Sequence, residues 1–192
     1  MIDFKGFTNT SLEKMILTTE RLILRPWEES DAENLYKYAS SPEVGPKCGW
    51  RAHTSAEHSL LVIHGTLSAP ETYAVCLKED NKAIGSISLN MGKYCLFKTP
   101  DNEGEIGYWI GVPFWGQGLI TEALREIIRH AFVDYKLEAL WGGYFDGNEK
   151  SKRVLDKCGF VYHHSKENCY FGGIEEKHTV HFTLLKRDAY GK

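Results

Sequence analysis

The sequence predicts a mixed α/β (α+β) fold, in which a mostly antiparallel central sheet is flanked by helices. Segments with the two-residue alternation of strands are interleaved with segments of helical period. Residues 73–77 and 83–91 alternate in this way and are separated by the polar turn 79–82, which is typical of an antiparallel hairpin. The apolar segment 106–110 then leads through a glycine-bearing turn into an amphipathic segment. This order indicates a strand, a turn and a helix at the centre of the chain.

Length and composition favour one domain. The chain has 192 residues, of which 42% are apolar, enough to bury roughly 70% of the unfolded surface in a single core. Residues 1–14 are polar and aperiodic. We therefore expect an N-terminal arm at residues 1–14, or an upstream start, and a single domain over residues 15–192.

Charge and cysteine content exclude several classes of protein. A net charge of −3 without a long basic run argues against sequence-independent binding to nucleic acid. The sequence has no run of 18 apolar residues and no signal-peptide core, so we expect a cytoplasmic protein with no membrane partner. The five cysteines are odd in number and lack a CxxC pair, which argues against disulfides and a zinc ribbon. His178 and His181 would face opposite sides of a strand, so no metal site is expected there.

The first elements are a strand and a helix. Residues 22–25 alternate and end at Pro26, which predicts a strand. Residues 30–39 place apolar side chains on one helical face, and Ser30 or Asp31 can cap this helix.

An irregular connection and a second helix follow. Residues 43–53 carry glycine, proline and Trp50, a composition typical of a loop. Residues 54–57 form a capping box, in which Thr54 bonds a helix amide and Glu57 reaches back. The helix that they open is expected to end near Gly65.

The loop 93–102 precedes the central strand. Its residues Tyr94 and Phe97 are too apolar for a simple linker, and two interpretations stay open: they line a substrate pocket or they pack against the sheet. Glu105 lies in the strand that leads to the break, and because this strand is expected to be central, a buried carboxyl there needs a physical reason. The strand breaks at Gly111-Val112, and a bulge or splay there would free backbone groups of Ile110 and Val112.

The turn after the central strand is interpreted as a pyrophosphate cradle. The first turn of a helix has four unpaired N–H groups and the positive end of the helix dipole, so it binds anions. Gly116 and Gly118 remove side chains that would separate a phosphate from this backbone, and Thr121 adds a hydroxyl. The alternative is a tight connection without a ligand. Neither the P-loop nor the dinucleotide-binding signature is present. The helix follows from an apolar stripe at three- and four-residue steps: Leu119, Ile120, Ala123, Leu124, Ile127, Ile128 and Ala131.

The C-terminal part predicts a strand, a helix and two further strands. Residues 139–145 form the strand, and a turn leads to Asn148, which starts a helix that Gly159 ends. Ser151 lies one helical turn after Asn148, so both side chains project toward the same edge. The strands 160–164 and 179–185 complete the sheet, and an exposed edge strand there could support a homodimer.

Two of these segments resemble a known family. The run WGQGLITEAL resembles the acetyl-CoA-binding motif of the GCN5-related N-acetyltransferase (GNAT) superfamily, Q/R-x-x-G-x-G/A, with Trp115 and Ile120 as departures. Its WGxGxxTEAL form is similar to the branch of ribosomal-protein and N-terminal (RimJ/RimL-like) acetyltransferases. The later run NEKSKRVLDKCGF resembles the second signature of the family. The resemblance covers roughly residues 15–187 and implies a GNAT-like sheet, splayed at the central strand.

The resemblance implies roles for particular residues. The amides of Gly116, Gln117, Gly118, Leu119, Ile120 and Thr121 would bind the pyrophosphate of acetyl-CoA. Backbone groups of Ile110 and Val112 would hold the pantetheine arm and the thioester carbonyl, and Asn148 would bond the pantetheine. Ser151 would also contact the cofactor, and either Ser151 or a bound water would be the proton donor. Glu105 would be the base, directly or through water, or a structural carboxyl bonded to backbone. The acceptor would contact Trp50, Tyr94 and Phe97. No metal is implied.

The implied activity is acetyl transfer to a primary amine by direct attack. Deprotonating a lysine at pH 7 costs roughly 4–5 kcal/mol, whereas an α-amine costs only about 1 kcal/mol. A protein N-terminus or a small-molecule amine is therefore the expected acceptor. Two alternatives stay open, a non-catalytic acyl-CoA sensor or interaction domain and a transferase for a longer acyl group.

Overall fold

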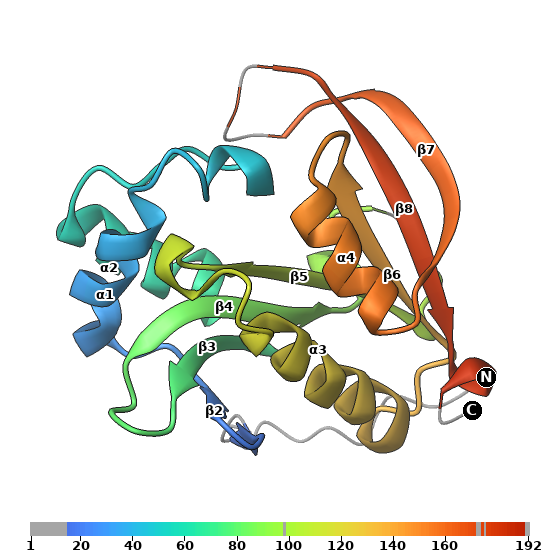
Figure 1. The fold of residues 1–192 in the computed structure, drawn as a ribbon, viewed down its shortest axis with the longest axis horizontal. Helices are drawn as coiled ribbons and strands as arrows, with labels where there is room; N and C mark the ends of the chain where they lie inside the picture. Colours follow the sequence, from blue (N-terminus) through green and yellow to red (C-terminus); the bar gives the residue numbers. More distant parts are fainter. Residues whose placement is uncertain (1–14, 98, 172–173, 175, 191–192) are drawn as a thin grey trace.

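The structure is a computed structural model that describes residues 15–97, 99–171, 174 and 176–190, and these residues contain one eight-stranded sheet (Figure 1). The strand order is β1-β2-β3-β4-β5-β6-β8-β7, and β5 with β6 is its one parallel pair. The mixed, mostly antiparallel sheet flanked by helices is thereby confirmed, whereas the predicted arm lies outside the described residues. The strands are β1 Leu17–Thr18, β2 Leu22–Arg25, β3 Thr72–Leu77, β4 Ala83–Asn90, β5 Glu103–Ile110, β6 Ala139–Phe145, β7 Val161–Cys169 and β8 His178–Lys186. The α-helices are α1 Ala32–Ala39, α2 Ala56–His64, α3 Leu119–Arg129 and α4 Glu149–Lys157.

The sheet separates two layers of apolar side chains. Because successive strand residues point to opposite faces, Tyr73 and Val75 join the core under α3, whereas Ala74 and Cys76 join the core under α1 and α2. The α3 stripe predicted from the sequence is buried from Leu119 to Ile128. Each face of the sheet is thus covered by its own helices.

The splay predicted for the central strand is present, and the pairing register defines it. β5 and β6 pair only from Glu103 opposite Ala139 to Ile106 opposite Gly142. Beyond that point β5 continues paired to β4, and β6 continues paired to β8. The sheet therefore opens between β5 and β6 over their C-terminal halves.

The backbone phase of β5 shows which groups face this opening. The N–H of Gly111 donates to the carbonyl of Ile84 at 2.8 Å, so odd-numbered residues of β5 bond to β4. The even-numbered Tyr108 and Ile110 then direct their N–H and C=O groups toward the β6 side, where β6 has diverged.

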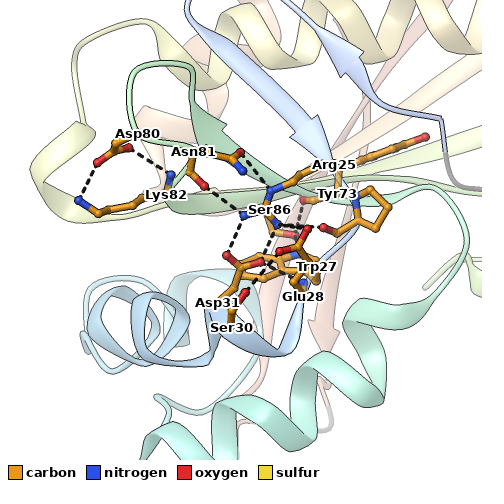
Figure 2. Close-up of polar contacts among 11 residues, drawn as sticks. Arg25, Trp27, Glu28, Ser30, Asp31, Tyr73, Asp80, Asn81, Lys82 and Ser86 are labelled. Atoms are coloured by element: carbon orange, nitrogen blue, oxygen red, sulfur yellow. Dashed lines mark hydrogen bonds and ion pairs between the residues drawn. The ribbon is translucent and has the colours of Figure 1, made fainter.

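A buried ion pair connects β2 to α1 and to the β3–β4 turn (Figure 2). The Arg25 guanidinium donates to both carboxylate oxygens of Asp31, at 2.7 and 2.9 Å, and to the side-chain and main-chain oxygens of Asn81. Arg25 and Asp31 are 6% and 4% exposed. Asp31 therefore does not cap α1, as the sequence suggested it could, because Arg25 binds its carboxylate.

Two further boundaries differ from the sequence prediction. Ser55 rather than Thr54 caps α2, accepting a hydrogen bond from the His58 amide at 3.1 Å. The edge strand β7 extends to Cys169, five residues beyond the predicted end, because bulges keep its distal part paired to β8. Figure 1 shows β7 at the outer side of β8.

A polar network is buried where α3 ends in a π-helical turn, His130–Asp134. His130 bonds Glu71 through Nε2 at 3.0 Å and Asp134 through Nδ1 at 2.6 Å. Burial lowers the pKa of His130, but the two carboxylates outweigh it, so the pKa is raised overall. Burial raises the pKa of Glu71, but bonds from His130, Tyr73 and Tyr135 lower it overall. The network thus stabilises the fold most between these two pKa values, since Glu71 is protonated below this window and His130 is neutral above it.

Candidate active site

The turn between β5 and α3 has the backbone conformation that its glycines predict. Gly116 and Gly118 have φ angles of 77° and 76°, which disfavour other residues. A Cβ at Gly116 would meet nothing within 4 Å, so the backbone conformation, not crowding, requires glycine there. The open space above this turn is what an anion cradle needs.

Backbone amides, not side chains, are available in this cradle. Leu119, Ile120 and Thr121 are buried, and the Gln117 side chain donates to the Pro113 carbonyl at 2.9 Å. The first intrahelical bond runs from the Glu122 amide to the Gly118 carbonyl, so the preceding amides lack helical partners. The hydroxyl predicted to join the cradle belongs to Thr121, a residue that is only 7% exposed.

Two cationic side chains that the sequence did not reveal flank the turn. Arg21, in the β1–β2 turn, donates to the Gln117 carbonyl at 3.1 Å and to Glu122 at 2.7 Å. Its Nη2 lies 3.8 Å from the position of a Cβ at Gly118. Lys150 places its ammonium 3.4 Å from the centre of the Trp115 ring. Arg21 and Lys150 thus place positive charge beside the turn. In the family motif the position of Trp115 is Gln or Arg, so this chain lacks a cation at that position of the motif itself.

The prediction that backbone groups of Ile110 and Val112 are free is wrong for both carbonyls. The Trp115 indole donates to the Ile110 carbonyl at 2.9 Å, and the Trp115 amide donates to the Val112 carbonyl at 3.1 Å. The cause is the 3-10 turn Val112–Phe114, which folds the chain back after β5. The Ile110 N–H still points to the opening, by the strand phase described above.

A hydroxyl pair spans from β5 to α4. The Tyr108 hydroxyl lies 2.9 Å from the Ser151 hydroxyl and 3.0 Å from the Ser151 carbonyl. Burial raises the pKa of Tyr108, so its phenol stays protonated at neutral pH. Asn148 caps α4 by accepting from the Ser151 amide at 3.2 Å, which fixes both predicted residues at the helix start. Sequence reasoning missed Tyr108, although its even-numbered position in β5 is shared with Ile106 and Ile110.

Glu105 is buried on the opposite face of β5. It is 5% exposed and accepts a hydrogen bond from the Phe97 amide at 3.1 Å. Burial raises its pKa more than the bonds from the 96–97 backbone lower it. The structural role considered for Glu105, bonding to backbone, is present, and the raised pKa also suits a base working near neutral pH.

The three predicted acceptor contacts occupy different places. Phe97 lines a cavity of about 300 Å³ together with Glu105. Trp50 packs edge-on against Trp109 at 5.9 Å, on the face that α1 and α2 cover. Tyr94 is 40% exposed and lies under the ammonium of Lys93, outside that cavity. The structure therefore joins Phe97 to Glu105 and leaves Tyr94 apart.

The sequence profile of the acetyltransferase (GNAT) domain family matches residues 21–161. The chain belongs to the GNAT family. The family predicted from the two signatures is thereby confirmed.

Relatives of this GNAT chain include the "Putative ribosomal N-acetyltransferase YdaF" of Bacillus subtilis (strain 168), which is 36% identical over 114 residues. The match covers 59% of this chain and 59% of that relative, less than two thirds of its length. A GNAT-family acetyltransferase from Bacillus anthracis shares the fold with a TM-score of 0.78 at 20% identity, over 91% of this chain and 99% of that one. RimL, a ribosomal alpha-N-protein acetyltransferase in complex with coenzyme A, has a TM-score of 0.74 at 19% identity, with the same coverage.

The described part of this GNAT chain contains no helix long and apolar enough to cross a membrane. It also holds no group of three or more histidine, cysteine, aspartate or glutamate side chains suited to a metal ion.

All five cysteines are free thiols. His178 stacks on Phe145 and His181 lies against Tyr144, so these histidines face opposite sides of β8, as predicted.

Proposed function

We propose that this GNAT chain transfers an acetyl group from acetyl-CoA to a primary amine by direct attack of the amine. The acceptor is a protein N-terminal amine, of the kind that the description of RimL as an alpha-N-protein acetyltransferase indicates for that protein, or a small-molecule amine. The observation that carries the proposal is the opening between β5 and β6. It has the buried Glu105 carboxyl on one face of β5 and the Tyr108–Ser151 hydroxyl pair on the other.

The residues around the opening fit acetyl-CoA. The amides at the start of α3, with Arg21 and Lys150 beside them, suit a pyrophosphate. The N–H groups of Tyr108 and Ile110 are directed into the opening, where β6 no longer supplies carbonyl acceptors. The amide carbonyls of a pantetheine arm could accept these hydrogen bonds instead. When bound, acetyl-CoA would supply the thioester carbon that the amine attacks.

Glu105 accepts one proton in the reaction, and the Tyr108–Ser151 hydroxyl pair donates another. Glu105, directly or through a water, accepts the proton that the acceptor nitrogen loses as the C–N bond forms. The Tyr108–Ser151 pair donates to the sulfur as the C–S bond breaks. A phenol is more acidic than a serine hydroxyl, so the pair is a better proton donor with Tyr108 than Ser151 would be alone.

Thiol release from acetyl-CoA tests this proposal directly. The panel comprises N-terminal peptides, free amino acids, polyamines and aminoglycosides, and acetyl-CoA affinity is measured separately by calorimetry. Thiol release that depends on an amine is expected. Binding without release with any amine would instead indicate an acyl-CoA sensor, and preference for longer acyl-CoA would indicate a different transferase.

Gly118→Trp is expected to abolish acetyl-CoA binding, measured by calorimetry, because the indole would cover the amides at the start of α3. The control is Gly92→Trp, since Gly92 also has a positive φ of 55° and open space around its Cβ position. Both variants carry the same type of backbone strain, which thermal melting reports. Equal acetyl-CoA affinity in the two variants would contradict the cradle.

The pH profile of kcat/KM is expected to rise through the raised pKa of Glu105, because the protonated carboxyl cannot accept a proton. Glu105→Gln should remove this acidic limb and lower kcat by about 10²-fold or more. The second rise of kcat/KM, at about pH 8 where an acceptor α-amine loses its proton, should remain. Glu138→Gln, at an exposed residue paired with Arg187, should keep the wild-type profile. An unchanged acidic limb in Glu105→Gln would leave Glu105 a structural role only.

A further inference from the structure

The cavity beside Glu105 lies on the face of the sheet that carries the Glu105 and Trp141 side chains. Its floor is made by side chains of β5, β6, β8 and β7, and the loop before β5 covers it. At about 300 Å³ it is at the lower end of the range for sites that take small ligands. It has room for one large side chain and its backbone.

Aromatic rings form the walls of this cavity. Phe97 packs edge-on against Phe182, with ring centres 4.5 Å apart, and His164 stacks on Phe182 at 4.6 Å. Trp141 completes the lining on the β6 side. Gly143 also lines the cavity, and a Cβ there would meet only Val180, at 3.4 Å. The walls favour an apolar or aromatic group.

The cavity has opposite charges at its two ends. Glu105 is buried at one end, whereas Lys166 is exposed at the other and lies on the cavity face because it pairs with Val180. Within the described residues, no carboxylate forms an ion pair with the Lys166 ammonium. An acceptor with an amine and a separate anionic group would complement both ends.

The sheet register sets the distance between these charges. Glu105 on β5 pairs with Trp141 on β6. Lys166 on β7 pairs with Val180 on β8, which pairs with Phe145 on β6. Lys166 is therefore three strands away from Glu105 and four residues further along the strand direction. Standard strand spacings then put the two backbones on the order of 19 Å apart. A single α-amino acid, whose amine and carboxylate are neighbours, is too short to reach both. Two or three residues of extended peptide, at about 3.3 Å each, bridge the remaining gap between the side-chain tips.

We infer that this cavity binds a peptide N-terminus with a bulky apolar first residue and an acidic residue at its third or fourth position. The inference rests on the proposed function and selects a protein N-terminus over a small amine. The α-amine lies at Glu105, the first side chain lies among Phe97, Trp141 and Phe182, and the acidic side chain pairs with Lys166. Acetylation removes the charge on the amine, so the product loses its attraction to Glu105 and can leave.

Four tetrapeptides test the inference through kcat/KM for thiol release: Phe-Ala-Glu-Ala, Ala-Ala-Glu-Ala, Phe-Ala-Gln-Ala and Phe-Ala-Lys-Ala. Phenylalanine first should exceed alanine first by about tenfold or more, because burying the ring is favourable. Glutamate at position three should exceed glutamine by about two- to fivefold, because the exposed Lys166 ammonium is screened by solvent, and should exceed lysine by more. Lys166→Met should abolish the difference between glutamate and glutamine. Lys152→Met, which removes an exposed lysine of α4, should retain it.

Gly143→Leu provides an independent test, because its side chain would occupy the cavity. It should abolish the preference for phenylalanine while acetyl-CoA affinity and the melting temperature stay close to wild type. Equal effects of Lys166→Met and Lys152→Met would overturn the inference, as would faster acetylation of free phenylalanine or a polyamine than of any tetrapeptide. In those cases thiol release still occurs and the proposed function stands. Absence of release with every amine would reject both.

Discussion

Asp31→Ala is expected to lower the free energy of unfolding by about 3–5 kcal/mol, because it leaves the buried Arg25 guanidinium without its carboxylate. The pair is bidentate and nearly excluded from water, so solvent cannot replace the lost bonds. Urea unfolding, extrapolated linearly to water, measures the change.

The control is Asp80→Ala, since Asp80 pairs with Lys82 in the exposed β3–β4 turn and little change is expected there (Figure 2). The double variant Arg25→Met with Asp31→Leu should recover much of the lost stability, because it buries neither charge. If Asp31→Ala unfolds at the same urea concentration as Asp80→Ala, the ion pair does not connect β2 to α1 in solution.

Local patterns allowed most helices and strands to be predicted, and the two signatures allowed the family. α4 begins at the Asn148 cap and is followed by Gly159 at a φ of 86°, as the sequence indicated. These features depend on residues within one helical turn of each other. They can therefore be predicted from one sequence without knowledge of the fold.

Features that depend on distant residues were mispredicted or missed. Asp31 has the chemistry of a helix cap, but Arg25 on a neighbouring strand binds its carboxylate. Arg21 reaches the α3 cradle from a turn 96 residues earlier in the chain. Only the tertiary structure decides which of several partners such a side chain finds.

The site itself was half predictable. Glu105 and Ser151 were chosen from the sequence, and the structure places them on opposite sides of β5. Tyr108 was missed because an apolar strand was expected to contribute backbone groups only. Counting residues in steps of two from Ile106 would have placed it on the α4 face, but its bond to Ser151 required the splay.

Tyr108→Phe and Ser151→Ala are each expected to lower kcat by about 10²-fold or more while acetyl-CoA affinity changes little, since the hydroxyl pair acts on the departing sulfur. Because the two hydroxyls bond to each other, the double variant should be hardly slower than either single variant. Steady-state thiol release and calorimetry separate the two effects. Tyr162→Phe, which removes an exposed hydroxyl from β7, is the matched control and should retain wild-type kcat. Additive losses in the double variant would mean that Tyr108 and Ser151 act separately. A kcat within twofold of wild type in both single variants would assign the proton donor to water, with the hydroxyl pair serving only to hold α4 against β5.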